Sequence, residues 1–214
     1  MRERIGNCYI ENNVAVDFCD ELDEELVIPD GVVAIKERAF SEYYGLMSVK
    51  FPNTLKTIGG AAFNRCSSLR RVCLPESVIS LDKYFPFIGT FSECKQLIEA
   101  DLSQTKIKSL DDGTFLGCKK LQKVKLPASL VKIGRYTFQN CTNLTALELN
   151  EGLKIIECDF MDNKHISILN IPNSVIHIED LSRCEHIKTI VLTKEQHEAF
   201  CEYLPPKCKF LFKE

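Results

Sequence analysis

The chain has 214 residues, a formal net charge of −3 and a hydrophobic fraction of 45%. This composition is ordinary for a globular protein with a sizeable core, and the slight negative charge argues against nucleic acid as a partner. No apolar run approaches the ~18 residues that span a bilayer, so membrane insertion is not expected.

Residues 1–25 precede the repetitive part of the chain and contain a turn signal. Tyr9-Ile10 and Val14–Val16 are short apolar segments on either side of Asn12-Asn13. Asparagine tolerates the positive φ angles of tight hairpin turns, so this pattern predicts a hairpin. Because the terminal coil of a repeat protein must be covered, we expect the hairpin to act as an N-terminal cap.

The N-terminal segment MRERIGNCYIENN has basic residues but no apolar stretch behind them. A secretory signal needs such a stretch, so the sequence predicts a cytoplasmic protein. A signal peptide absent from the sequence would instead make the protein secreted or displayed at the cell surface.

A unit of about 23 residues recurs between Leu26 and Leu192. Its clearest copies are Val49–Arg71 (VKFPNTLKTIGGAAFNRCSSLRR) and Val124–Ala146 (VKLPASLVKIGRYTFQNCTNLTA). Self-similarity at a fixed period of this size is typical of a stacked solenoid. Each copy contains an LxxLxL pattern, as in Leu121/Val124/Leu126, which predicts a strand with alternating inward and outward side chains.

The second half of each copy predicts another wall and a packed interior. After the proline that ends most of these strands, apolar residues follow at positions three and six, as in Leu130 and Ile133, and indicate a second extended segment. A phenylalanine and, three residues later, a cysteine complete the unit. We expect both to stack in buried columns. The cysteines at this position are Cys66, Cys94, Cys118, Cys141 and Cys184. Free buried thiols favour a reducing compartment.

One copy is longer than the others, because Leu74 and Leu102 are 28 residues apart instead of 23. The extra residues lie around Tyr84, Phe85 and Phe87, and insertions in solenoids form surface loops. Two interpretations stay open. The aromatic rings fold back over the flank of the coil, or they form an exposed contact patch for a partner.

The repeat stops after Leu192. Thr193 followed by Gln196 is a capping-box pattern, which predicts a short helix from Lys194 to about Tyr203. Pro205-Pro206 would end that helix, and Lys209–Phe212 would add a last extended segment. The sequence therefore predicts a helical C-terminal cap.

The repeats resemble the BspA-like leucine-rich repeat family, whose unit is close to LPxxVxxIGxxAFxxCxxLxxVxL. Residues 52–74 and 127–149 match this unit almost position for position. The resemblance implies an α/β solenoid, mostly β, of about seven coils with a parallel sheet on its concave face. As one structural domain it would contain an N-terminal hairpin cap (1–25), the solenoid (26–192) and the C-terminal cap (193–214). Members of the family are mostly interaction proteins, and many are surface adhesins.

The sequence contains no GxSxG, GxxxxGK[ST] or HExxH motif, so neither an enzyme nor a cofactor is expected. A zinc site deserves weighing because His197 and Cys201 lie four residues apart on the predicted helix, with Cys208, Cys184 and His186 as further donors. Zinc sites usually show paired CxxC or HxxxH spacing, which is missing here. No metal site is expected.

Strand alternation identifies the side chains that point outward from the concave face. The candidate partner-binding residues are Lys50, Arg71, Glu99, Asp101, Lys123, Lys125, Glu148, Ile168 and Asn170. Basic and acidic residues follow one another along the axis, either as cross-strand pairs that stabilise the sheet or as a surface that selects a partner. Ala146, Ile168 and Val191 make the C-terminal end less polar, and Cys73 is the one exposed thiol expected on this sheet.

The preferred hypothesis is a non-enzymatic protein–protein interaction module that binds a protein partner through the concave face, as a cytoplasmic adaptor, inhibitor or regulator. The alternative, which rests on the resemblance, is a surface adhesin for host or extracellular-matrix proteins. The Tyr84–Phe87 loop is the alternative contact site. The sequence leaves the oligomeric state and the identity of the partner open.

Overall fold

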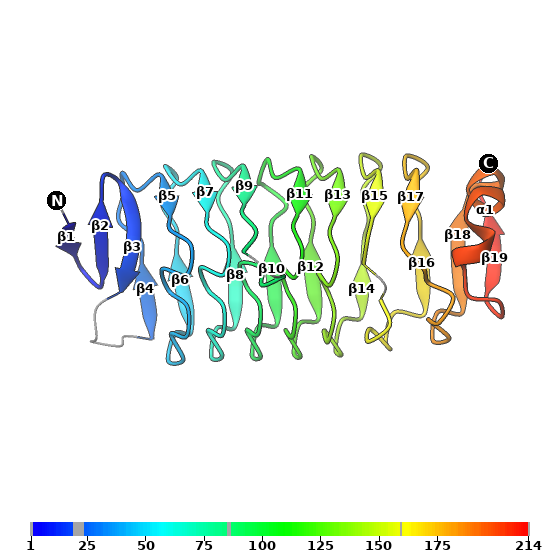
Figure 1. Cartoon of the computed structure of the whole chain (residues 1–214), viewed down its shortest axis with the longest axis horizontal. Helices are drawn as coiled ribbons and strands as arrows, with labels where there is room; N and C mark the ends of the chain where they lie inside the picture. The colour runs from blue at the N-terminus through cyan, green and yellow to red at the C-terminus, as the bar shows by residue number, and fades with distance from the viewer. Residues whose placement is uncertain (1, 19–23, 85–86, 159, 214) are drawn as a thin grey trace.

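The computed structural model describes residues 2–18, 24–84, 87–158 and 160–213. They form an elongated, mostly β solenoid of about eight turns, with one short helix at its C-terminal end (Figure 1). The predicted fold is confirmed. The coil number exceeds the expected seven because Glu25–Val27 (β4) already pairs in parallel with Ser48–Lys50 (β6) as a complete first coil.

The LxxLxL segments form one row of strands, which we call the front wall; it is the face predicted as concave. After β4 and β6, its described strands are β8 (Arg71–Cys73), β10 (Glu99–Asp101), β12 (Lys123–Lys125), β14 (Ala146–Leu147), β16 (Ile168–Asn170) and β18 (Thr189–Leu192). They pair in parallel within three sheets, β4-β6, β8-β10-β12-β14 and β16-β18-β19. Equivalent residues of neighbouring coils are therefore side by side.

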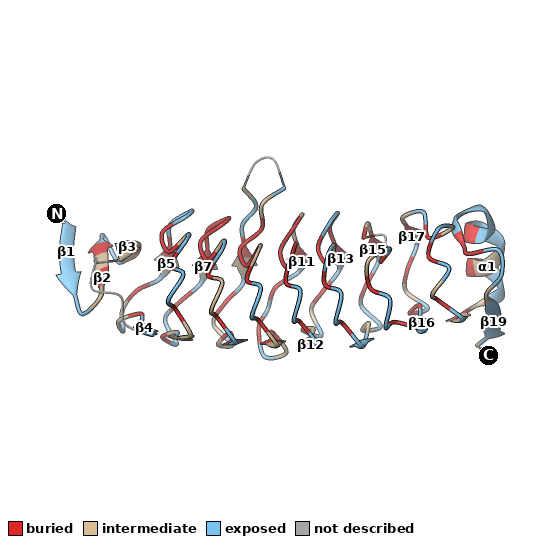
Figure 2. Ribbon diagram, turned by 90° about the horizontal axis from the view of Figure 1, so that it is seen from below, coloured by how far each residue is buried: buried red, intermediate tan, exposed pale blue. Residues whose placement is uncertain are grey.

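The predicted second extended segments form the other row, which we call the back wall (Figure 1). Its two-residue strands are β5 (Ala34–Ile35), β7 (Thr57–Ile58), β9 (Ser80–Leu81), β11 (Ser109–Leu110), β13 (Lys132–Ile133), β15 (Ile155–Ile156) and β17 (His177–Ile178). They belong to two sheets that meet between β9 and β11. The described residues on either side of 85–86 leave the line of coils at this junction (Figure 2).

Columns of identical side chains fill the space between the walls, as predicted. Phenylalanine rings of successive coils, from Phe40 to Phe138, stack with centroids 5.3 to 6.0 Å apart. All five column cysteines are buried. The thiol of Cys118, for example, donates to the carbonyl oxygen of Phe91 in the preceding coil at 3.1 Å. Burial raises the pKa of Cys66 and Cys141 to about 12, so both stay neutral thiols.

Asn163 occupies the cysteine position of one coil, which the sequence pattern did not reveal. It is fully buried, and its Nδ2 donates to the carbonyl oxygens of Phe138 at 3.0 Å and Cys141 at 3.1 Å. An amide thus takes over the bond that the thiol makes in the other coils.

The N-terminal cap is larger than the predicted hairpin. Arg2–Ile5 (β1), Cys8–Glu11 (β2) and Val14–Phe18 (β3) form an antiparallel meander, and β3 then pairs in parallel with β5 of the back wall. The turn at Asn12 and Asn13 has φ angles of 49° and 63°, as its residues predict. The cap buries Cys8, Ile10 and Ala15 and so closes the first coil.

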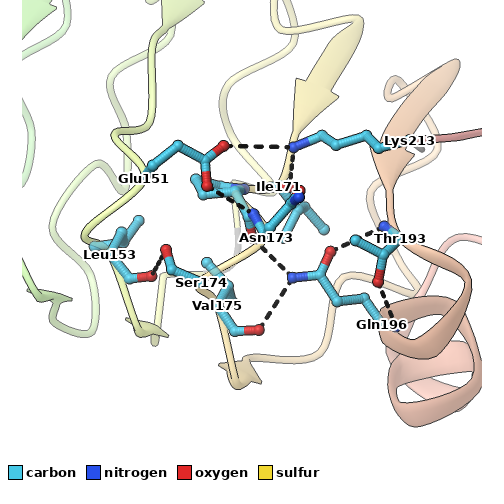
Figure 3. Close-up of polar contacts among 10 residues, drawn as sticks. Glu151, Leu153, Ile171, Asn173, Ser174, Val175, Thr193, Gln196 and Lys213 are labelled. Carbon is cyan, nitrogen blue, oxygen red and sulfur yellow. Dashed lines mark hydrogen bonds and ion pairs between the residues drawn. The ribbon is translucent and has the colours of Figure 1, made fainter.

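The C-terminal cap contains the predicted helix and last strand. Helix α1 spans Lys194–Phe200 and begins with the capping box between Thr193 and Gln196, whereas Cys201–Tyr203 is a 3-10 turn instead of α-helix. Buried Gln196 also donates through Nε2 to the carbonyl oxygens of Pro172 (2.7 Å) and Val175 (3.0 Å), which ties the helix to the preceding coil (Figure 3). Strand β19 (Lys209–Phe212) pairs in parallel with β18.

Candidate functional site

The structure places all nine predicted binding residues on or beside the front wall. The in-register ladder from β8 to β12 puts Arg71, Glu99 and Lys123 in one row and Cys73, Asp101 and Lys125 in the next. Opposite charges are therefore neighbours along the solenoid axis. This arrangement follows from the repeat, because equivalent positions of a stacked coil face each other at ~4.8 Å.

The central charges pair with one another. Lys125 Nζ lies 2.5 Å from Asp101 Oδ2 and 3.7 Å from Glu99 Oε1. Partial burial alone would raise the pKa of Asp101, but hydrogen bonds from Lys125 and Ser103 outweigh it and hold that pKa below its usual value. The same contact with Asp101 raises the pKa of Lys125. Cross-strand pairing therefore explains these residues without a partner.

The front wall is hollowed around Ala146. Two adjoining cavities of about 250 and 340 Å³ share Ala146 and Glu148 as lining residues, and we call them together the Ala146 hollow. Lys123 and Lys125 line one end, whereas Ile168 and Asn170 line the other. The small alanine leaves space where the neighbouring coils carry long side chains. Five of the nine predicted residues thus come together, and Lys50, Arg71, Glu99 and Asp101 do not line the hollow.

The hollow coincides with a break in the sheet. Strand β14 contains only Ala146 and Leu147, and it has no described ladder to β16. This coil is one of those without the usual proline, and Asn150 at that place donates through Nδ2 to the carbonyl oxygens of Ala128 (3.2 Å) and Leu130 (3.1 Å). The substitution of proline by asparagine was visible in the sequence, but its link to a hollow was not.

The less polar C-terminal end of the front wall extends further than predicted. Ile168 has 63% of its surface exposed, and half-buried Val191 lies opposite Asn170 on the next strand. In the ladder to β19, Leu211 lies next to Val191 and is 41% exposed. Leu211 was missed because nothing in the tail sequence shows that its strand joins the front wall.

The inserted loop packs mainly on its neighbours. The Phe87 ring contacts Tyr136 edge-to-face with centroids 5.2 Å apart, and the guanidinium of Arg38 lies 5.7 Å from the ring centre of Tyr84. Gly113 is required below the loop, because a Cβ there would collide with the carbonyl oxygen of Phe87. Phe85 lies outside the described residues. The contacts favour rings folded over the flank, although Phe87 keeps 43% of its surface exposed.

The tail residues weighed as metal ligands have other surroundings. His197 packs edge-to-face on Phe210 and Phe212, with centroids 4.6 and 5.5 Å away. Within the described ranges, no group of three or more His, Cys, Asp or Glu side chains could hold a metal ion. Cys73 is exposed as predicted, and Cys201 outside the sheet is a second exposed thiol.

None of the helices in the described part of the chain is long and apolar enough to cross a bilayer.

Comparisons with known proteins agree with the repeat pattern. A family model described as a BspA type leucine rich repeat region matches six copies, over residues 10–121 and 108–204. No curated protein matches the sequence.

Two solved structures are similar in fold. A leucine-rich repeat protein from Bacteroides ovatus is 23% identical with a TM-score of 0.65, and one from Eubacterium ventriosum is 21% identical with a TM-score of 0.73. The matches cover 89% and 85% of this chain but only 54% and 49% of those proteins. The chain therefore spans about half the length of these structures, and the likeness concerns the fold alone.

Proposed function

Because the chain belongs to the BspA-type leucine-rich repeat family, we propose that it binds a protein partner through the front wall, with the Ala146 hollow as the anchor point. The repeat family suggests a protein-interaction module, and folds of this kind are typically non-enzymatic. The observation that carries the proposal is the hollow itself. It opens beside a row of mutually paired charges, and it collects five candidate residues from β12, from β16 and from Glu148, just after β14.

The lining of the hollow indicates the chemistry of the partner. Lys123 is exposed and has no ion-pair partner within the described ranges, and the apolar side chain of Ile168 lies at the opposite end. An apolar side chain flanked by a carboxylate would fill the space, contact Ile168 and pair with Lys123. Anchors of this type carry most of the binding energy in protein interfaces, and the surrounding charges set partner choice.

Filling the hollow tests this proposal. An Ala146→Arg variant should lose partner binding at least tenfold, because the long side chain occupies the space that the anchor needs. Ser48→Arg places the same side chain in the equivalent row of an N-terminal coil and should bind normally. Partners captured by the unmodified chain would be identified, purified and titrated against both variants. Undiminished binding by Ala146→Arg would refute the hollow as the anchor point.

We also propose that the protein works in a reducing compartment such as the cytoplasm. Seven cysteines support this assignment as free thiols, namely Cys66, Cys73, Cys94, Cys118, Cys141, Cys201 and Cys208. Protease treatment of intact cells should leave the protein undigested. Its loss under that treatment would instead favour the surface adhesin.

A further inference from the structure

A second regular surface runs along the back wall. The residue immediately before each two-residue back strand is exposed, and these residues alternate between β-branched apolar and lysine along the whole array. We call this column the back ridge. It consists of Val33, Lys56, Ile79, Lys108, Val131, Lys154 and Ile176.

Backbone hydrogen bonds hold the back ridge in line. The backbone amide of Lys56 donates to the carbonyl oxygen of Val33 at 2.8 Å, and the amide of Ile79 donates to the carbonyl oxygen of Lys56 at 2.9 Å. The series resumes at Lys108 and continues through Val131 and Lys154 to Ile176, also at 2.8 to 2.9 Å. Members joined by these bonds are thus ~4.8 Å apart, and Lys108 and Lys154, which are two bonded steps apart, are separated by ~9.6 Å. Among the described residues, the Ile79–Lys108 step, where the two back sheets meet, lacks this bond.

The side chains of the back ridge are available to a partner. Its four apolar members are between 39% and 72% exposed, with Ile176 the most exposed. Lys56, Lys108 and Lys154 are exposed and have no ion-pair partner within the described ranges. Nearby Lys106 and Lys132, by contrast, pair with Glu76 and Glu157. The three lysines of the back ridge therefore differ from these two neighbours in carrying unpaired charges.

We propose that the back ridge binds an extended, acidic, proline-rich segment of a partner protein, with a carboxylate at every third residue. A polyproline II helix has three residues per turn and rises ~9.3 Å per turn, so carboxylates of this period lie on one side and match the ~9.6 Å lysine spacing. The mismatch between Lys108 and Lys154 is only ~0.3 Å. Proline rings between the carboxylates would contact Ile79 and Val131.

Other extended or helical segments fit this period less well. On a β-strand, residues on one face repeat every ~6.7 Å, so carboxylates would fall out of step with the lysines after one interval. An α-helix repeats after seven residues, or ~10.5 Å, and accumulates about three times the mismatch of polyproline II. The charge pattern therefore selects both an acidic sequence and a backbone conformation. The inference is independent of the proposed front-wall function, because it concerns the other wall.

Two labelled synthetic peptides of identical composition test the inference. The first repeats Asp-Pro-Val four times, and the second contains the same residues with its four aspartates adjacent. Fluorescence anisotropy with the purified chain should show at least tenfold tighter binding of the periodic peptide, and its affinity should fall as salt rises. Equal affinities, or no binding of either peptide, would overturn the proposal and leave the lysines as a solvated surface.

Charge reversal locates the binding to the back ridge. Lys108→Glu/Lys154→Glu should weaken binding of the periodic peptide at least tenfold. The matched variant Lys119→Glu/Lys164→Glu changes the same charge at two exposed lysines outside the ridge and should bind normally. A milder pair, Lys108→Ala/Lys154→Ala, covers the case in which the reversed variant does not fold. Equal losses in ridge and control variants would contradict a specific site.

Discussion

At the scale of single residues, the interior is organised by a bond that each coil makes to the one before it. The Phe column stacks ring on ring, and the residue three positions later donates to the preceding phenylalanine carbonyl. The spacing of phenylalanine and cysteine predicted both columns, because burial of small apolar residues follows from the repeat. It did not predict the hydrogen bonds of the thiols or the burial of Asn163. A periodic pattern does not reveal which polar residue finds hydrogen-bond partners in the interior.

Substitution of Asn163 tests this reading. Asn163→Ala removes both amide bonds and leaves the carbonyl oxygens of Phe138 and Cys141 with one backbone donor each, so we expect a loss of about 1–3 kcal/mol in unfolding free energy. Asn163→Cys should cost distinctly less, because its thiol can donate to Phe138 as the other column cysteines do. Urea unfolding followed by circular dichroism would compare the two. Equal losses would show that the column position has no special preference for a donor.

At the scale of elements, the strands and the helix were predictable and their breaks were not. The LxxLxL segments and the capping box follow from alternation and from local side-chain bonds, and all appear in the structure. The interruptions after β9 and β14 depend on how whole coils stack, which no single segment encodes. The Ala146 hollow lies at one of these breaks, so its charged residues were predictable but their grouping was not.

The attachment of helix α1 is a test at this scale. Gln196 closes the capping box and also bonds to Pro172 and Val175, so Gln196→Ala should lower the unfolding free energy by about 2–4 kcal/mol. Glu198→Ala on the same helix changes an exposed side chain and should have an effect within ~0.5 kcal/mol. Thermal or urea unfolding measures both. A Gln196 variant as stable as the Glu198 variant would mean that the cap is held by apolar packing alone.

At the scale of the whole molecule, the solenoid presents two long walls with different chemistry. The front wall carries paired charges beside one hollow, and the back wall carries unpaired lysines on alternate coils. Both patterns come from residues that differ from coil to coil at the outward-facing positions of the repeat. The repeat residues therefore specify the scaffold, and the variable outward residues distinguish one member of such a family from another.

Hydrogen–deuterium exchange of the chain with and without its captured partner tests the central claim most directly. Binding through the Ala146 hollow predicts that amides of β12, β14 and β16 exchange more slowly in the complex. Slower exchange confined to the back wall, or to residues 84–88, with β12 to β16 unaffected, would contradict the front wall as the binding surface.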